Sequence, residues 1–129
     1  MNNAIIVGGG PGSLGGTIAA HLTDMYERVF VFDLHPGEYD ARANAADEIF
    51  ADTLIQALYK RQPELVINFV GRIDYRLCED LTTSNFSNIF DTNMLQLVNC
   101  ARALANYEVS TNFIQIGSNS ASQPFTGMF

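Results

Sequence analysis

The sequence has few cationic residues: seven lysines and arginines stand against 14 aspartates and glutamates, which gives a formal net charge of −7. Proteins that bind nucleic acid or an anionic membrane surface need clustered Lys and Arg, so this composition argues against both kinds of partner. No apolar run approaches the roughly 20 residues that a membrane-spanning helix needs. We therefore expect neither a nucleic-acid partner nor a membrane partner.

Cysteine is also scarce. Cys78 and Cys100 form no CxxC pair, and no histidine lies near them at metal-ligand spacing. This argues against a disulfide framework and predicts no metal site. The amino terminus lacks the basic segment and the longer apolar run of a signal peptide. Reduced thiols and a cytoplasmic location are the expectation.

What the chain does contain is a regular alternation of short apolar runs with helical patterns. Its 129 residues, 47% of them hydrophobic, suffice for one domain with a core. The expected strands are Ala4–Val7, Val29–Phe32, Ile49–Ala51, Leu65–Val70 and Phe113–Ile116, and the expected helices cover residues 14–25, 53–60 and 84–106. Such alternation predicts an α/β fold: a three-layer, Rossmann-type, doubly wound parallel sheet of about five strands.

A glycine-rich segment follows the first expected strand. It fits GxxGxxG at Gly9, Gly12 and Gly15, and GxGxxG when Gly10 is the first glycine. Glycines let the backbone approach a pyrophosphate closely, and the next helix offers its free N–H groups and positive dipole end. No Gly-Lys-Ser/Thr closes the segment, so it is not a P-loop. A generic tight turn is the alternative. The predicted dinucleotide contacts are Gly8, Gly9, Gly10, Pro11, Gly12, Ser13, Leu14 and Gly15.

Asp33 follows the second expected strand, about 20 residues after the glycines, where a ribose-binding acid belongs. A carboxylate there accepts hydrogen bonds from the ribose hydroxyls and repels a 2′-phosphate. The next residues, Leu34 and His35, include no Arg or Lys, which favours NAD over NADP. Asp33 and Leu34 are the predicted cofactor contacts here. The alternative is a solvated aspartate at the start of a turn.

These motifs, in this order, resemble the short-chain dehydrogenase/reductase family over nearly all 129 residues. The family opens with TGxxxGxG, in which Gly8 here takes the place of Thr and Ser13 that of the middle Gly. The resemblance implies an NAD(P)-binding domain over residues 1–129. It further implies hydride transfer between a nicotinamide and a small-molecule alcohol or carbonyl, and a homo-oligomer.

Other residues take their expected roles from that resemblance alone. Asp52 and Thr53 resemble the pair after the third strand, whose Asp bonds the adenine amino group. Asn93 corresponds to an Asn that helps hold a proton-relay water, and Ser118 to the catalytic Ser, with Ser120 a nearby competitor. A helix residue and a turn residue are the alternatives for Asn93 and Ser118. Asn68, Phe69, Val70 and Gly71 resemble the family's NNAG motif, on the adenosine side of the cofactor, with two of its four positions kept.

The family's chemistry also needs a YxxxK motif about a dozen residues after that Ser, and the sequence stops at Phe129. We therefore expect a chain truncated before the YxxxK helix and inactive by itself. Two other interpretations stay open. One is a non-catalytic dinucleotide-binding module. The other is an FAD-binding protein, since Val7–Gly12 resembles an FAD-type loop, although such proteins usually carry Glu where Asp33 stands.

Overall fold

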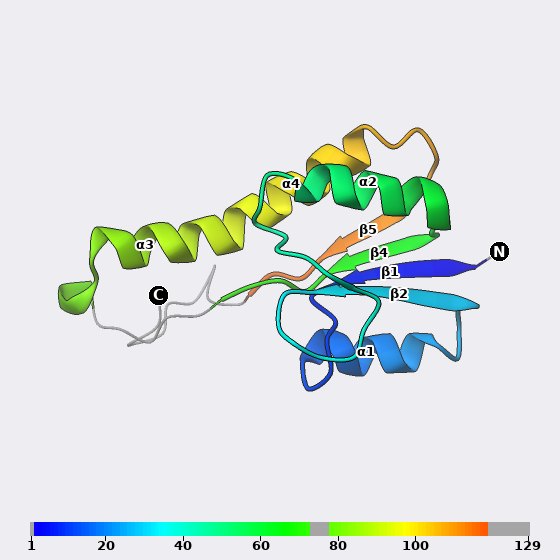
Figure 1. Ribbon diagram of the computed structural model, residues 1–129, viewed down its shortest axis with the longest axis horizontal. Coiled ribbons are helices and arrows are strands. Elements are labelled where there is room, and N and C mark those ends of the chain that lie inside the picture. The colour runs from blue at the N-terminus through cyan, green and yellow to red at the C-terminus, as the bar shows by residue number, and fades with distance from the viewer. Residues whose placement is uncertain (1, 73–77, 119–129) are drawn as a thin grey trace.

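The computed structural model describes residues 2–72 and 78–118 and has one parallel sheet between two layers of helices (Figure 1). The strands run in the spatial order β3-β2-β1-β4-β5. Helix α1 covers one face, and α2 and α4 cover the other (Figure 1). The predicted α/β fold with a parallel sheet is confirmed. The strands are β1 (Asn3–Val7), β2 (Arg28–Asp33), β3 (Ala41–Arg42), β4 (Leu65–Asn68) and β5 (Asn112–Gln115), and the helices are α1 (Leu14–Leu22), α2 (Phe50–Arg61), α3 (Thr83–Phe90) and α4 (Gln96–Ala105).

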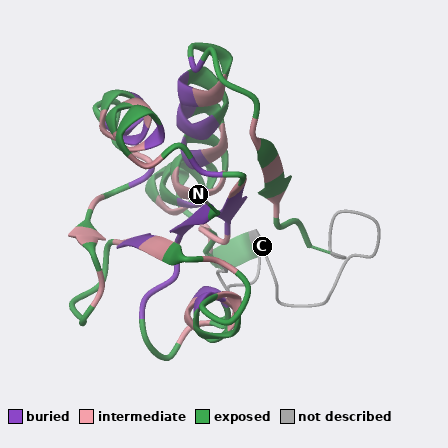
Figure 2. Cartoon of the chain, turned by 90° about the vertical axis from the view of Figure 1, so that its right-hand side faces the viewer, coloured by how far each residue is buried: buried purple, intermediate pink, exposed green. Residues whose placement is uncertain are grey.

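Strand β1 forms the centre of the core because it is buried on both faces (Figure 2). Ile5 and Val7 belong to the apolar cluster that also contains Leu54 of α2 and Cys100 of α4. Ile6 points the other way and belongs to a smaller cluster with Ala19, Val31 and Ile67. Alternate residues of one apolar strand thus serve two helical layers, as a parallel sheet requires.

The third strand was predicted wrongly. Residues 49–51 do not form a strand: β3 is Ala41–Arg42, and helix α2 begins at Phe50. The buried residues of α2, namely Phe50, Ala51, Leu54 and Leu58, follow helical spacing, so the apolar run is the start of a helix face. In so short an apolar run, periodicity alone cannot distinguish a helix from a strand. Strand β3 escaped notice because it is two residues long and pairs only with Phe32 and Asp33.

The long helix predicted over residues 84–106 is interrupted. Its start is capped by Thr82, whose hydroxyl accepts from the Asn85 backbone N–H while the Asn85 side chain accepts from the Thr82 N–H. Between α3 and α4 lies a π-helical turn, η2 (Asp91–Leu95). A π turn widens the hydrogen-bonded loop by one residue and is often found at functional sites. A short 3-10 turn, η1 (Cys78–Asp80), precedes α3.

No helix within residues 2–72 and 78–118 is long and apolar enough to cross a membrane.

Candidate functional site

The glycine loop joins β1 to α1 and is organised by Ser13. The Ser13 hydroxyl donates to the carbonyl oxygen of Gly10 at 2.6 Å and accepts from the backbone N–H of Gly16 at 3.0 Å. Ser13 is therefore the N-cap of α1 and also fastens the loop to the helix start. The first N–H groups of α1 are consequently presented at the loop, where an anion would be stabilised.

Two positions of the loop favour glycine, one because of a close backbone contact and one because of its backbone conformation. A Cβ on Gly15 would lie 2.2 Å from the Gly8 carbonyl oxygen, so any side chain there would force the helix away from the loop. Gly12 has a φ of 84°, in the region that L side chains rarely adopt. Gly16, which sequence reasoning did not single out, is as tight as Gly15, with a Cβ position 2.3 Å from the Gly10 carbonyl oxygen.

Asp33 lies at the end of β2 and accepts three backbone hydrogen bonds from two segments of the chain. Its Oδ2 accepts from the Gly10 N–H at 2.7 Å. Its Oδ1 accepts from the N–H groups of Leu34 at 2.7 Å and His35 at 3.0 Å. The carboxylate thus holds the glycine loop beside the turn that follows β2. It remains partly exposed, so part of its acceptor capacity faces solvent.

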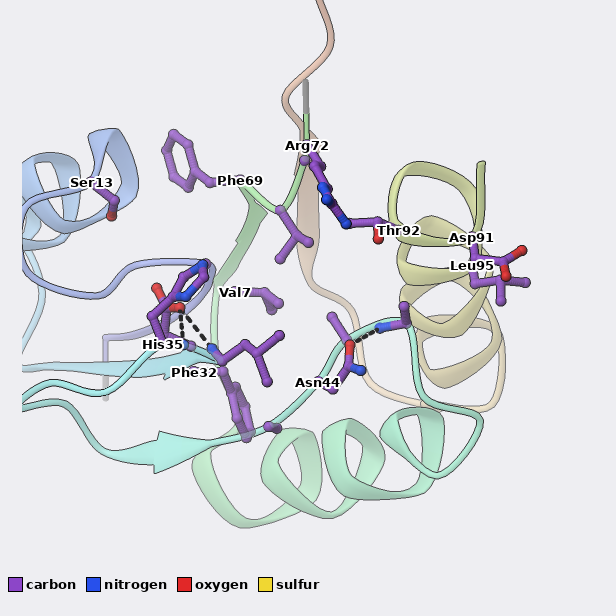
Figure 3. Close-up of a pocket in the computed structure, with 18 of the residues that line it drawn as sticks. Val7, Ser13, Phe32, His35, Asn44, Phe69, Arg72, Asp91, Thr92 and Leu95 are labelled. Carbon is purple, nitrogen blue, oxygen red and sulfur yellow. Dashed lines mark hydrogen bonds between the residues drawn. The ribbon is translucent and has the colours of Figure 1, made fainter. Parts of the chain in front are cut away.

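A cavity of about 690 Å³ opens at the carboxyl ends of the strands, beside this carboxylate (Figure 3). Ligands of open parallel sheets bind at this edge, and the volume suits a small organic ligand. Seven of its lining residues were predicted as cofactor contacts: Gly8, Ser13, Asp33, Leu34, Phe69, Val70 and Gly71. A neighbouring cavity of about 240 Å³ is lined by three more predicted residues, Gly10, Pro11 and Gly12. It shares the predicted residues Ser13 and Asp33 with the larger cavity.

Two of the predicted asparagines, Asn68 and Asn93, form hydrogen bonds to residues next to the cavity without lining it themselves. Asn93, in η2, accepts from the Arg72 N–H at 2.8 Å and donates to the Arg72 carbonyl at 2.9 Å. Asn68 is fully buried and donates to the side-chain oxygens of Gln96 and of Gln115, the latter at 2.8 Å. Neither is among the described residues that line the cavities. The Asn68 Oδ1 also accepts from the Val70 N–H at 3.1 Å. Both asparagines therefore fix backbone around the cavity in this structure.

Other predicted positions lie outside the cavities. Asp52 is exposed in the first turn of α2, and Thr53 donates to the Ile49 carbonyl at 3.2 Å, so neither follows a strand as expected. Their assignment as adenine contacts rested on the strand at 49–51 and needs correction. Ser118 is exposed beyond the end of β5. The described cavity linings do not include Ser118, nor the predicted contacts Gly9, Leu14 and Gly15. Ser120 lies outside the described residues.

The structure adds lining residues that the sequence did not reveal. Residues 43–46, between β3 and α2, form one wall, and Arg72 with the start of η2 forms another (Figure 3). His35 also lines both cavities. Alanines in a polar stretch carry no functional signal, so only tertiary structure could have identified that wall. The additional residues of the larger cavity are Val7, Phe32, His35, Ala43, Asn44, Ala45, Ala46, Arg72, Asn88, Asp91, Thr92 and Leu95.

Cys100 is buried in the core on α4 and takes no part in the cavity lining. Desolvation raises the pKa of its thiol to about 12. The thiolate is the nucleophilic form of cysteine, so a thiol held protonated in this way is inert at neutral pH. Cys100 is a core residue.

Solved structures of short-chain dehydrogenases share this fold. A short-chain dehydrogenase/reductase from Serratia marcescens aligns with a TM-score of 0.80 at 20% identity, over 98% of this chain and 59% of that one. A family member from Francisella tularensis gives 0.83 at 15% identity, over 100% of this chain and 56% of the other. ElxO, solved with NADP bound, gives 0.81 at 17%, over 98% and 60%. No protein-family model matches the sequence, and no curated protein does.

The predicted resemblance to short-chain dehydrogenases is therefore confirmed at the level of the fold. The chain spans about 60% of the length of these structures. At identities of 15–20% the likeness carries no statement about substrate or catalytic residues.

Proposed function

We propose that this chain binds NAD at the carboxyl edge of its sheet and serves an oxidoreductase of the short-chain type. The observation that carries the proposal is the joint geometry of the glycine loop and Asp33. Gly10 and Asp33 are hydrogen-bonded at 2.7 Å, and Asp33 lines both cavities while Gly10 lines the smaller one. A pyrophosphate at the helix start and a ribose at the acid are the two demands of a dinucleotide.

The loop fits such a ligand. Sequence neighbours aside, no described atom lies within 4 Å of where a Cβ would project from Gly12, so the loop tip is open to a phosphate. Ser13 lines both cavities, and its hydroxyl could turn from the Gly10 carbonyl toward a phosphate oxygen. When bound, the nicotinamide supplies hydride chemistry, and the protein contributes binding and orientation.

NAD is preferred over NADP in this proposal because Asp33 would repel a 2′-phosphate. Of the cations in this region, Arg72 lines the larger cavity on the wall that includes the start of η2. Arg42, on β3, donates its Nε to the Leu34 carbonyl at 2.8 Å and is not among the described lining residues. The NADP bound to ElxO shows that a relative in fold takes the phosphorylated form. The choice is therefore an experimental question for this chain.

The reaction we propose is hydride exchange with a small alcohol or carbonyl compound, with Ser118 as a hydrogen-bonding group and Asn93 near the proton path. A cytoplasmic homo-oligomer is the proposed setting. A second candidate is a dinucleotide-binding module without catalysis. It is favoured by the two hydrogen bonds that occupy the Asn93 amide on the Arg72 backbone, which leave that side chain a structural task.

Calorimetric titration with NAD, NADP and FAD tests the proposal. We expect NAD to bind with one site per chain, more tightly than NADP, and FAD not to bind. Absorbance at 340 nm with a panel of alcohols then separates the two candidates, since only the oxidoreductase produces NADH. Binding of FAD in preference to NAD would overturn the proposed function.

A further inference from the structure

Helix α4 carries a buried carboxamide that reaches the loop between β3 and α2. Asn99 is 3% exposed, and its Nδ2 donates to the carbonyl oxygens of Ala45 at 2.9 Å and Asp47 at 2.8 Å. These bonds join parts of the chain more than 50 residues apart in sequence. Both hydrogens of one NH₂ group are used on the backbone of a single short segment, which is a fixed and directional attachment.

That segment has little else of regular structure to hold it. It follows a strand of only two residues and precedes α2. Its other bonds are local, apart from Ala43, whose N–H donates to the Asp33 carbonyl at 2.8 Å. Asn44 accepts from the Ala46 N–H through its Oδ1 at 3.0 Å and from the Asp47 N–H through its carbonyl at 3.0 Å. Asn99 thus provides long-range hydrogen bonds at the end of the segment that leads into α2.

The segment is also a wall of the larger cavity. Ala43, Asn44, Ala45 and Ala46 all line it, together with Asp33 (Figure 3). Strand β3 lies beside β2 at the edge of the sheet, away from β4 and β5. A nucleotide with its ribose at Asp33 and its phosphates at α1 would therefore place its base toward this wall.

We propose that Asn99 is a positioning residue for adenosine recognition: from the core side of α4 it fixes the wall formed by residues 43–47. Asn99 itself does not touch the ligand. Without its NH₂ group, the Ala45 carbonyl loses this donor and the Asp47 carbonyl keeps only the local bond from the Phe50 N–H, so the wall can move away from the base. The inference rests on the proposed function, because an adenine nucleotide must occupy the cavity.

The test compares Asn99→Leu, which keeps the size of the side chain but removes both donors, with Asn3→Leu. Asn3 is also a buried asparagine, whose Nδ2 donates to the Arg61 carbonyl at 2.5 Å, at the opposite end of the sheet from the cavity. Both variants lose stability. In Asn99→Leu we expect the dissociation constant for ADP to rise about tenfold, the size of effect that loss of one hydrogen bond typically has. In Asn3→Leu we expect the dissociation constant for ADP to be unchanged. Asn99→Ala, which removes both donors without adding an apolar branch, replaces the leucine variant if that does not fold, and we expect the same loss of ADP affinity.

A ligand-free readout separates this inference from the proposed function. Amide hydrogen exchange at Ala46 and Asp47 is expected to accelerate in Asn99→Leu relative to wild type, while exchange in β1 stays slow. If wild type binds neither NAD nor ADP, the proposed function fails, and with it the adenosine role. If wild type binds ADP and Asn99→Leu binds it equally well, or its 43–47 exchange is unchanged, the positioning role is overturned while the proposed function stands.

Discussion

The Oδ2 atom of Asp33 lies 2.7 Å from the backbone nitrogen of Gly10 and accepts its hydrogen. This bond connects the end of β2 with the loop that follows β1, across the two strands that form the centre of the proposed site. A Cβ on Gly10 would lie 2.6 Å from the same oxygen, so the approach depends on glycine. The acid therefore shapes the loop besides presenting charge to a ligand.

Replacing Asp33 tests its proposed roles in NAD binding and in the choice between NAD and NADP. In Asp33→Ala we expect the dissociation constant of NAD to rise about tenfold, since a charge-assisted hydrogen bond is worth about 1.5–3 kcal/mol and part of it is shared with the protein backbone. The preference for NAD over NADP should shrink because the repulsion of the 2′-phosphate is gone. Calorimetry with both nucleotides measures this. Asp24→Ala, in the exposed turn after α1, is the matched control. An unchanged NAD/NADP ratio would disprove the role of Asp33 in selectivity.

Three glycine-to-alanine variants separate close approach from backbone conformation. Gly15→Ala introduces a Cβ at 2.2 Å from the Gly8 carbonyl oxygen and should cost the most stability, about 3 kcal/mol, the upper end of the usual cost of overpacking. Gly12→Ala meets no described atom within 4 Å but keeps a φ of 84°, which costs about 1–2 kcal/mol. Gly117→Ala has neither problem and should change stability by less than about 0.5 kcal/mol. Urea unfolding measures the order, and an equal loss in all three would contradict it.

The sequence was sufficient for the parts of the fold that depend on strong local signals. The apolar runs that became β1, β2, β4 and β5, and the glycine loop between β1 and α1, were predictable from composition and spacing. The parallel arrangement followed from their alternation with helices. Strand β3 was not predictable, because two residues paired at an edge leave no periodic pattern.

The site was predictable only where backbone chemistry leaves a mark on the sequence. Glycines and the acid after β2 are such marks, since a close approach excludes side chains and a ribose demands an acceptor. The wall at residues 43–46 consists of three alanines and one asparagine, and the residue that fixes it, Asn99, lies more than 50 positions away. A tertiary contact of that kind cannot be read from one sequence.

An exposed apolar stripe on α3, η2 and α4 predicts self-association. We define the stripe as Phe86, Phe90, Met94 and Val98, of which the two phenylalanines stack with ring centroids 6.2 Å apart and are each 50% exposed. Burying such a stripe against a second chain removes apolar surface from water. Wild type should sediment as a dimer or larger at micromolar concentration.

Phe90→Glu should shift that equilibrium toward monomer, because a carboxylate cannot be buried in an apolar contact without cost. Met25→Glu, at another exposed apolar position after α1, should leave it unchanged. A wild-type protein that sediments as a monomer, or a Phe90→Glu variant that still associates, would refute the stripe as the interface.

The Cys100 thiol predicts a loss of stability in alkali. Burial raises its pKa from 9.0 to about 12, so the folded state keeps the proton that the unfolded state releases above pH 9. Its contribution is therefore constant below pH 9 and falls by about 1.4 kcal/mol per pH unit between 9 and 12. Burial, and then the neighbouring Tyr59, also raise the pKa of Tyr107, which acts in the same direction.

Cys100→Ala isolates the thiol. The variant loses stability at pH 7 because it leaves a small void in the core. Its unfolding free energy should nevertheless decline less steeply than that of wild type from pH 9 to 10.5. Urea unfolding at pH 7, 9 and 10.5 measures the two slopes. Equal slopes would show that Cys100 does not control the alkaline limb.

The central claim is that the glycine loop and Asp33 together bind NAD, and amide chemical shifts recorded during an NAD titration test it most directly. We predict saturable shifts at Gly10, Gly12 and Ser13 together with Leu34 and Ala46, fitting one dissociation constant and one site. Unperturbed amides at these positions at millimolar NAD, or shifts confined to residues away from the carboxyl edge of the sheet, would contradict the account.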